Sequence, residues 1–131
     1  MDSPNVELAR VAMDAFNTRD LETFDRCVAE DFEWVTATAS NPEPRTYLGR
    51  AGIRDFFEYV ENWRTVEARV DEWRDLGDDV LLVGEVTWRG PNPKLLEVTC
   101  PLLSLWSFEG GRLKRIDSAM APDVVPATPA G

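Results

Sequence analysis

The apolar positions in the first part of the chain follow helical spacing. Ser3 followed by Pro4 is typical of a helix start, because a serine hydroxyl can cap the first turn and proline fits the first helical position. One apolar face then recurs at intervals of three and four residues and comprises Leu8, Val11, Ala12, Ala15 and Phe16. The polar segment 17–19 ends the pattern. The spacing therefore predicts a first helix that ends before this segment.

The same reasoning predicts two further helices and a strand between them. Asp20 is placed to cap a second helix, whose apolar face comprises Leu21, Phe24, Cys27 and Val28. A third helix is expected over 49–62, with Ile53, Phe56, Phe57 and Val60 on one face. Residues 32–38 alternate instead, which is typical of a strand. One side of this strand carries Phe32, Trp34 and Thr36, and the other carries Glu33, Val35 and Ala37.

The second half of the chain predicts a series of strands. They are expected over 66–76, 80–89, 95–108 and 112–120, with turns at 77–79, 91–93 and 109–111. A further loop is expected at 40–44. The order helix, helix, strand, helix and then strands predicts an α+β fold, in which the helices cover one face of a curved antiparallel sheet.

The segment 95–108 is apolar on both of its faces. Cys100, Leu102 and Trp106 share one face, whereas Pro101, Leu103 and Leu105 share the other. A sheet with one solvated face normally alternates apolar and polar residues. Since the helices can cover only one face, we expect a homodimer in which a second copy covers the outer face of the sheet.

Composition narrows the classes of partner. The chain has 131 residues and a formal net charge of −10, which disfavours nucleic acid and anionic membranes as partners. Its length predicts a single domain over 1–131, with a flexible tail at 121–131. No basic leader or long apolar run is visible, and the two cysteines, Cys27 and Cys100, fit no metal spacing. These features favour a cytoplasmic protein with free thiols.

The chain contains no histidine. That excludes Ser-His-Asp and Cys-His catalysis and removes the commonest metal ligand. Glycine-rich phosphate loops are absent as well. We therefore expect neither a metal nor a cofactor.

Three stretches resemble the SnoaL-like proteins of the NTF2-like superfamily. They are AFNTRDLETFDRCVAEDFEWV at 15–35, YLGRAGIRDFF at 47–57 and LWSFEGGRLKRID at 105–117. The likeness covers about residues 5 to 120. It implies a cone-shaped curved antiparallel sheet wrapped by three helices around an apolar cavity, a cystatin-like α+β roll. The family includes polyketide cyclases, ketosteroid isomerases, limonene-epoxide hydrolases and proteins without activity, so the resemblance predicts the fold better than the reaction.

The resemblance also directs attention to particular positions. The acid and base positions of a ketosteroid isomerase match Ala12, Thr36 and Ser104, which cannot perform that proton transfer. The last-strand acid of an epoxide hydrolase matches Ser118, with Asp117 one residue away. Asp117 and Glu85 are the candidate general acids or bases, although a surface carboxylate is the simpler interpretation of each. The predicted cavity lining comprises Phe16, Phe32, Trp34, Thr36, Tyr47, Phe57, Trp63, Trp88, Ser104, Trp106 and Ser118.

Three functions remain open at this point. The first is a cofactor-independent cyclase, isomerase or hydrolase acting on an apolar substrate. The second is a binding module that holds a small apolar or aromatic molecule without chemistry, because aromatic side chains suit such a pocket. The third is a dimeric interaction domain with a filled cavity.

Overall fold

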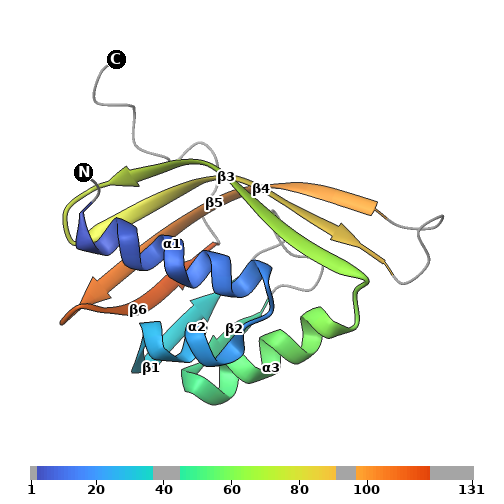
Figure 1. Cartoon of the computed structure of the whole chain (residues 1–131), viewed down its shortest axis with the longest axis horizontal. Helices are drawn as coiled ribbons and strands as arrows, with labels where there is room; N and C mark the ends of the chain where they lie inside the picture. The colour runs from blue at the N-terminus through green and yellow to red at the C-terminus, as the bar shows by residue number, and fades with distance from the viewer. Residues whose placement is uncertain (1–2, 37–44, 91–96, 119–131) are drawn as a thin grey trace.

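The computed structural model describes residues 3–36, 45–90 and 97–118. These residues form three helices and a six-stranded sheet (Figure 1). The helices are α1 (Pro4–Asn17), α2 (Leu21–Cys27) and α3 (Gly49–Glu61). The strands are β1 (Val28–Val35), β2 (Thr46–Leu48), β3 (Thr65–Asp75), β4 (Asp79–Arg89), β5 (Glu97–Glu109) and β6 (Arg112–Asp117).

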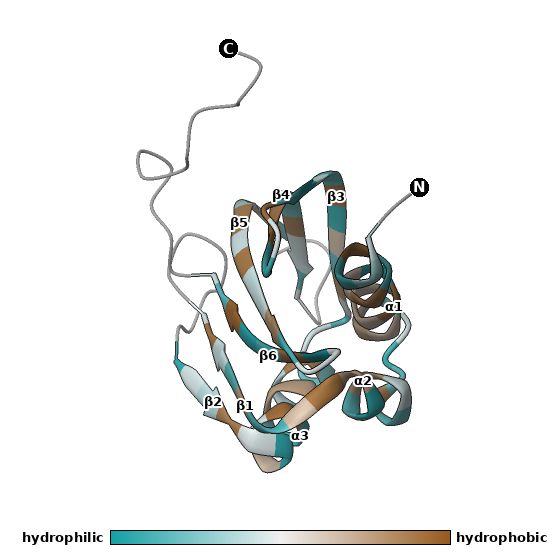
Figure 2. Ribbon diagram, turned by 90° about the vertical axis from the view of Figure 1, so that its left-hand side faces the viewer, coloured by the Kyte–Doolittle hydropathy of each residue, from teal (hydrophilic) through white to brown (hydrophobic). Residues whose placement is uncertain are grey.

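The sheet has the strand order β2-β1-β6-β5-β4-β3. Four of its five strand pairs are antiparallel, and β1 pairs with β6 in parallel. The parallel pair departs from the antiparallel sheet expected from the sequence, because β1 precedes α3 in the chain and joins the far side of the β3–β6 meander. Figure 2 shows the sheet curling so that the helices lie on its concave side. The α+β architecture with three helices on a curved sheet is thus confirmed.

Helix α1 begins at the predicted cap and packs through a slightly rotated face. The Ser3 hydroxyl accepts a hydrogen bond from the backbone N–H of Val6 at 3.2 Å. The buried side chains are Val6, Ala9, Ala12, Met13, Ala15 and Phe16. Val11 was predicted to face inward but is 47% exposed. A stripe at 6, 9, 13 and 16 fits the same helical period, so periodicity alone did not distinguish the two neighbouring faces.

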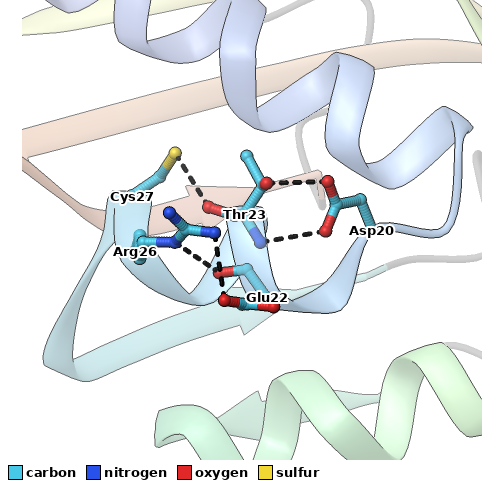
Figure 3. Close-up of polar contacts among 5 residues, drawn as sticks. All are labelled: Asp20, Glu22, Thr23, Arg26 and Cys27. Atoms are coloured by element: carbon cyan, nitrogen blue, oxygen red, sulfur yellow. Dashed lines mark hydrogen bonds and ion pairs between the residues drawn. The ribbon is translucent and has the colours of Figure 1, made fainter.

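The short helix α2 is held by contacts within its own turns (Figure 3). The Asp20 carboxylate accepts hydrogen bonds from the Thr23 N–H at 3.1 Å and from the Thr23 hydroxyl at 2.7 Å. Those bonds lower the pKa of Asp20. The Cys27 thiol donates to the Thr23 carbonyl oxygen at 3.3 Å. These contacts order a helix too short to be stable alone.

Several boundaries differ from the predictions. β1 begins at Val28, which was assigned to the second helix, and it therefore starts before the predicted residue 32. The three-residue strand β2 was missed, because it is too short to show an alternation. The loop 40–44, the turn 91–93, the tail 121–131 and Ala37 lie outside the described residues.

The core lies between the helices and the concave face, and it is dominated by aromatic rings. Phe24 stacks on Trp34 with ring centroids 5.1 Å apart, and Phe56 meets Trp34 edge-on at 4.4 Å. Phe16 contacts Trp34 and Phe56 at 5.8 and 5.9 Å. Rings from α1, α2, α3 and β1 thus form one cluster that joins the helices to the sheet.

Candidate functional site

A cavity of about 50 Å³ lies inside this core, between the helices and the concave face of the sheet. Helices α1 and α3 and five of the strands contribute side chains to its wall. Seven predicted lining residues border it: Phe16, Trp34, Thr36, Trp88, Ser104, Trp106 and Ser118. An engineered cavity that accepts benzene measures about 150 Å³, so this hollow is small.

Strand register explains why these side chains meet. Leu82 of β4 lies opposite Ser104 of β5, and Trp106 of β5 lies opposite Ile116 of β6. Side chains at directly opposite positions point to the same face of a sheet. All four border the cavity. Alternation along each strand therefore repeats the inward direction every second residue.

Four predicted lining residues do not border the cavity. Phe32 is fully buried and packs against Phe24, with ring centroids 6.2 Å apart. Phe57 contacts Phe24 at 5.6 Å, and Tyr47 contacts Phe56 at 4.8 Å. Trp63 packs edge-on against Trp88 at 5.2 Å. They face the same interior, but other rings separate them from the hollow.

Sequence reasoning missed seven residues that border the cavity: Met13, Phe56, Ala68, Leu82, Val86, Leu102 and Ile116. Phe56 was placed on the correct helix face, and Leu102 on the correct face of β5. Leu82 and Val86 share the even-numbered face of β4 with Trp88, so alternation could have found them. Met13 could not be found in this way, because the apolar face predicted for the first helix did not include it.

The polar part of the cavity is a chain of three hydrogen-bonding side chains. Ser104 Oγ and Ser118 Oγ lie 2.9 Å apart. The indole Nε1 of Trp106 donates to Ser104 Oγ at 3.1 Å. Ser104, Ser118 and Trp106 are 1%, 5% and 2% exposed. The wall thus combines apolar surface with a small group of neutral hydrogen-bonding atoms.

Thr36 also borders the cavity, but its hydroxyl is already committed. Thr36 Oγ1 donates to the Arg45 carbonyl oxygen at 2.8 Å and accepts from the Arg45 N–H at 2.8 Å. These bonds join the end of β1 to the residue before β2. Thr36 therefore serves mainly to hold these two segments together.

The two candidate acid or base residues lie on the opposite face of the sheet. Asp117 is opposite Leu105, which faces away from the cavity, and its carboxylate lies 3.6 Å from Arg115 Nη1. Glu85 forms an ion pair with Arg69 of β3. Neither borders the cavity. The one-residue offset between Asp117 and Ser118 puts the serine inside and the carboxylate outside.

No charged side chain of the described residues borders the cavity. Within the same residues there is no group of three or more cysteine, aspartate or glutamate side chains arranged to hold a metal ion. None of the described helices has the length and apolar character needed to cross a membrane.

Solved structures with the same architecture cover nearly the whole chain. TerC co-crystallised with polyporic acid superposes with a TM-score of 0.75 at 23% identity, covering 91% of this chain and 92% of that one. An NTF2-like protein of unknown function from Burkholderia pseudomallei K96243 gives 0.79 at 21% identity, with 92% of each chain covered. A cystatin-fold protein from Novosphingobium aromaticivorans gives 0.70 at 20% identity, covering 88% of this chain and 97% of that one.

These likenesses, each below 25% identity, establish the fold. A comparison with curated protein sequences finds no significant match. The family model for the SnoaL-like domain matches residues 9–116. This range includes the stretches 15–35 and 47–57, and all but the last residue of 105–117. The chain therefore belongs to the SnoaL-like domain family.

Proposed function

We propose that this protein binds a small, uncharged apolar or aromatic molecule in the cavity on the concave side of its sheet. The observation that carries the proposal is the chemistry of the wall. Aromatic and aliphatic side chains surround two serine hydroxyls and one indole N–H, and no charged side chain of the described residues borders the hollow. Such a surface favours ligands whose apolar area is removed from water.

Binding is better supported than acid–base catalysis. A cyclase, isomerase or hydrolase of the predicted kind needs a proton-handling group within reach of its substrate. Asp117 and Glu85 lie on the other face and are paired with arginines. The co-crystallisation of TerC with polyporic acid supports testing for an organic ligand in this fold.

The cavity must widen for a ring-sized ligand to enter, and Met13 is the side chain best suited to move. It borders the hollow from α1 and is 8% exposed. A methionine side chain is unbranched and adapts its shape more readily than the aromatic and branched residues around it. We infer that displacement of Met13 adjusts the volume to the ligand.

Toluene titration followed by NMR tests the proposal. In ¹H–¹⁵N spectra, toluene should shift the indole N–H signals of Trp34, Trp88 and Trp106, which border the cavity. Val86→Phe fills the hollow and should abolish the shifts. Val83→Phe is the matched control, because Val83 lies on the same strand and faces away. Equal shifts in both variants would place the binding elsewhere and refute the proposal.

We also propose that the protein forms a homodimer through the outer face of its sheet. Val83 of β4 lies opposite Leu103 of β5, and both are half-buried, beside the exposed Pro101. Ion-paired side chains of both signs flank this apolar strip, including Arg69 with Glu85 and Arg115 with Asp117. A surface that carries both signs around an apolar centre can be complementary to itself across a two-fold axis.

A further inference from the structure

The three polar side chains of the cavity wall contain more hydrogen-bond donors than they use. The Trp106 indole, the Ser104 hydroxyl and the Ser118 hydroxyl supply three donor hydrogens. They form two hydrogen bonds, Trp106 to Ser104 and the bond between the serines. One hydroxyl hydrogen is therefore left without an acceptor among the described residues.

This count does not depend on the direction of the bond between the serines. If Ser104 donates to Ser118, the hydrogen of Ser118 is free. If Ser118 donates to Ser104, then Ser104 accepts two hydrogen bonds and its own hydrogen is free. In both cases the free hydrogen belongs to a side chain at most 5% exposed that borders the cavity. A buried donor without an acceptor is costly, so this position favours an occupant that supplies one.

The remaining wall limits what that acceptor can be. The Thr36 hydroxyl already donates its hydrogen bond to the Arg45 carbonyl oxygen. No lysine or arginine among the described residues borders the cavity to neutralise an anion. A buried carboxylate without a cationic partner is strongly disfavoured. The acceptor must therefore be neutral.

We propose that Ser104 and Ser118 form a single-donor site that selects ligands carrying one neutral carbonyl oxygen on an apolar ring. The ring contacts the aromatic wall, and the carbonyl oxygen accepts the free hydroxyl hydrogen. This inference rests on the proposed function, since it assumes that the cavity binds an apolar molecule. It adds a chemical class to that ligand: ring ketones are preferred over hydrocarbons of the same shape and over carboxylates.

Three probes of similar size test the selectivity. Cyclohexanone carries the carbonyl, methylenecyclohexane has the same shape without an acceptor, and cyclohexanecarboxylate carries a charge. Binding is followed by NMR through the indole N–H signal of Trp106, which is assigned with the Trp106→Phe variant. We expect cyclohexanone to bind about tenfold more tightly than methylenecyclohexane, as one net hydrogen bond predicts. Cyclohexanecarboxylate should bind more weakly than both.

Two variants test the donor count. Ser118→Ala removes one hydroxyl but leaves the hydroxyl of Ser104 free to donate, so the preference for cyclohexanone should persist. The triple variant Ser104→Ala/Trp106→Phe/Ser118→Ala removes all three donors, so the two neutral probes should bind equally. Because this variant lacks Trp106, binding to it is followed through the indole N–H signals of Trp34 and Trp88, which also border the cavity. Methylenecyclohexane must still bind to the variant, which shows that the cavity has remained intact.

The outcomes separate the two proposals. Equal affinity of the wild-type protein for the two neutral probes would overturn the single-donor site and leave apolar binding in place. Such a result would mean that the hydroxyl gains nothing from the ketone, for example because a bound water molecule already accepts its hydrogen. If neither neutral probe binds to the wild type or to the wider Met13→Ala variant, the proposed function fails and this inference fails with it. The comparison of the two neutral probes uses the wild-type protein, so its result does not depend on whether any variant folds.

Discussion

The side-chain amide of Asn17 forms two hydrogen bonds with the backbone of Ala68. Asn17 Nδ2 donates to the Ala68 carbonyl oxygen at 2.9 Å, and Asn17 Oδ1 accepts from the Ala68 N–H at 2.9 Å. Since β3 is the last strand in the sheet order, no strand of the described residues pairs with its outer edge. Asn17 supplies the missing partner at one residue, and it fixes the end of α1 beside a residue that borders the cavity.

Replacement of Asn17 by alanine should destabilise the protein. Both backbone groups of Ala68 would lose a part-buried partner, which predicts a loss of about 2 kcal/mol in the free energy of unfolding. Urea denaturation measures this loss. Asn5→Ala is the control, because Asn5 forms one exposed hydrogen bond to the Gly77 carbonyl oxygen. A loss at Asn17 no larger than that at Asn5 would show that the edge contact has little energetic role.

Replacement of Met13 by alanine should widen the cavity and improve binding of ring-sized probes. The substitution removes buried side-chain volume, so we expect a loss of about 2 to 3 kcal/mol in stability. Toluene should nevertheless bind more tightly, because the site no longer has to displace the methionine. Isothermal denaturation and NMR titration measure the two effects.

The control for this variant is Val6→Ala. Val6 is buried on α1 but does not border the cavity. It should lose stability without a gain in toluene affinity. A gain in both variants would attribute the effect to general loosening of α1.

The stabilising effect of Asp20 should depend on pH. The hydrogen bonds from Thr23 hold the pKa of Asp20 below its ordinary value of 3.8. A carboxylate with a lowered pKa stabilises the folded state above its unfolded pKa, and this contribution is lost as the pH falls through the lower, folded value. The difference in unfolding free energy between wild type and Asp20→Ala should therefore be constant above about pH 5 and shrink below about pH 4.

Urea denaturation between neutral and acidic pH measures this difference. The Asp20→Asn variant retains an oxygen that can cap α2 but does not titrate. Its difference from Asp20→Ala should therefore stay nearly constant with pH. A wild-type difference that is equally constant would contradict the assignment of the effect to the carboxylate.

Placement of a charge at Leu103 should dissociate the proposed homodimer. Leu103→Glu puts a carboxylate in the centre of the outer apolar strip, where it would lose its hydration in the interface. We expect the dissociation constant to rise at least tenfold by sedimentation velocity. Val11→Glu makes the same change at an apolar residue that is 47% exposed on α1, so it should leave the dimer intact. A wild-type protein that sediments as a monomer at micromolar concentration would refute the homodimer.

Local patterns in the sequence were sufficient to predict the elements and most of their directions. Ser3 and Asp20 were identified as caps from their residue type and position, and both accept the expected backbone hydrogen bonds. The alternation over 32–36 correctly placed Phe32 and Trp34 of β1, and Thr36 directly after it, on the buried side. Such features depend on contacts within a few residues, so a single sequence contains the information that specifies them.

Tertiary structure decided the pairing of distant elements and the contents of the cavity wall. The parallel pairing of β1 with β6 and the choice between neighbouring faces of α1 depend on contacts between residues far apart in the chain. The placement of Ser118 inside and Asp117 outside follows from the β5–β6 register, because a shift of one residue exchanges the two faces of a strand. The sequence by itself determined an α+β domain of the SnoaL-like type with a core rich in aromatic side chains. Only the packing of its distant segments determined that the interior presents serine hydroxyls to a small hollow and turns its carboxylates outward.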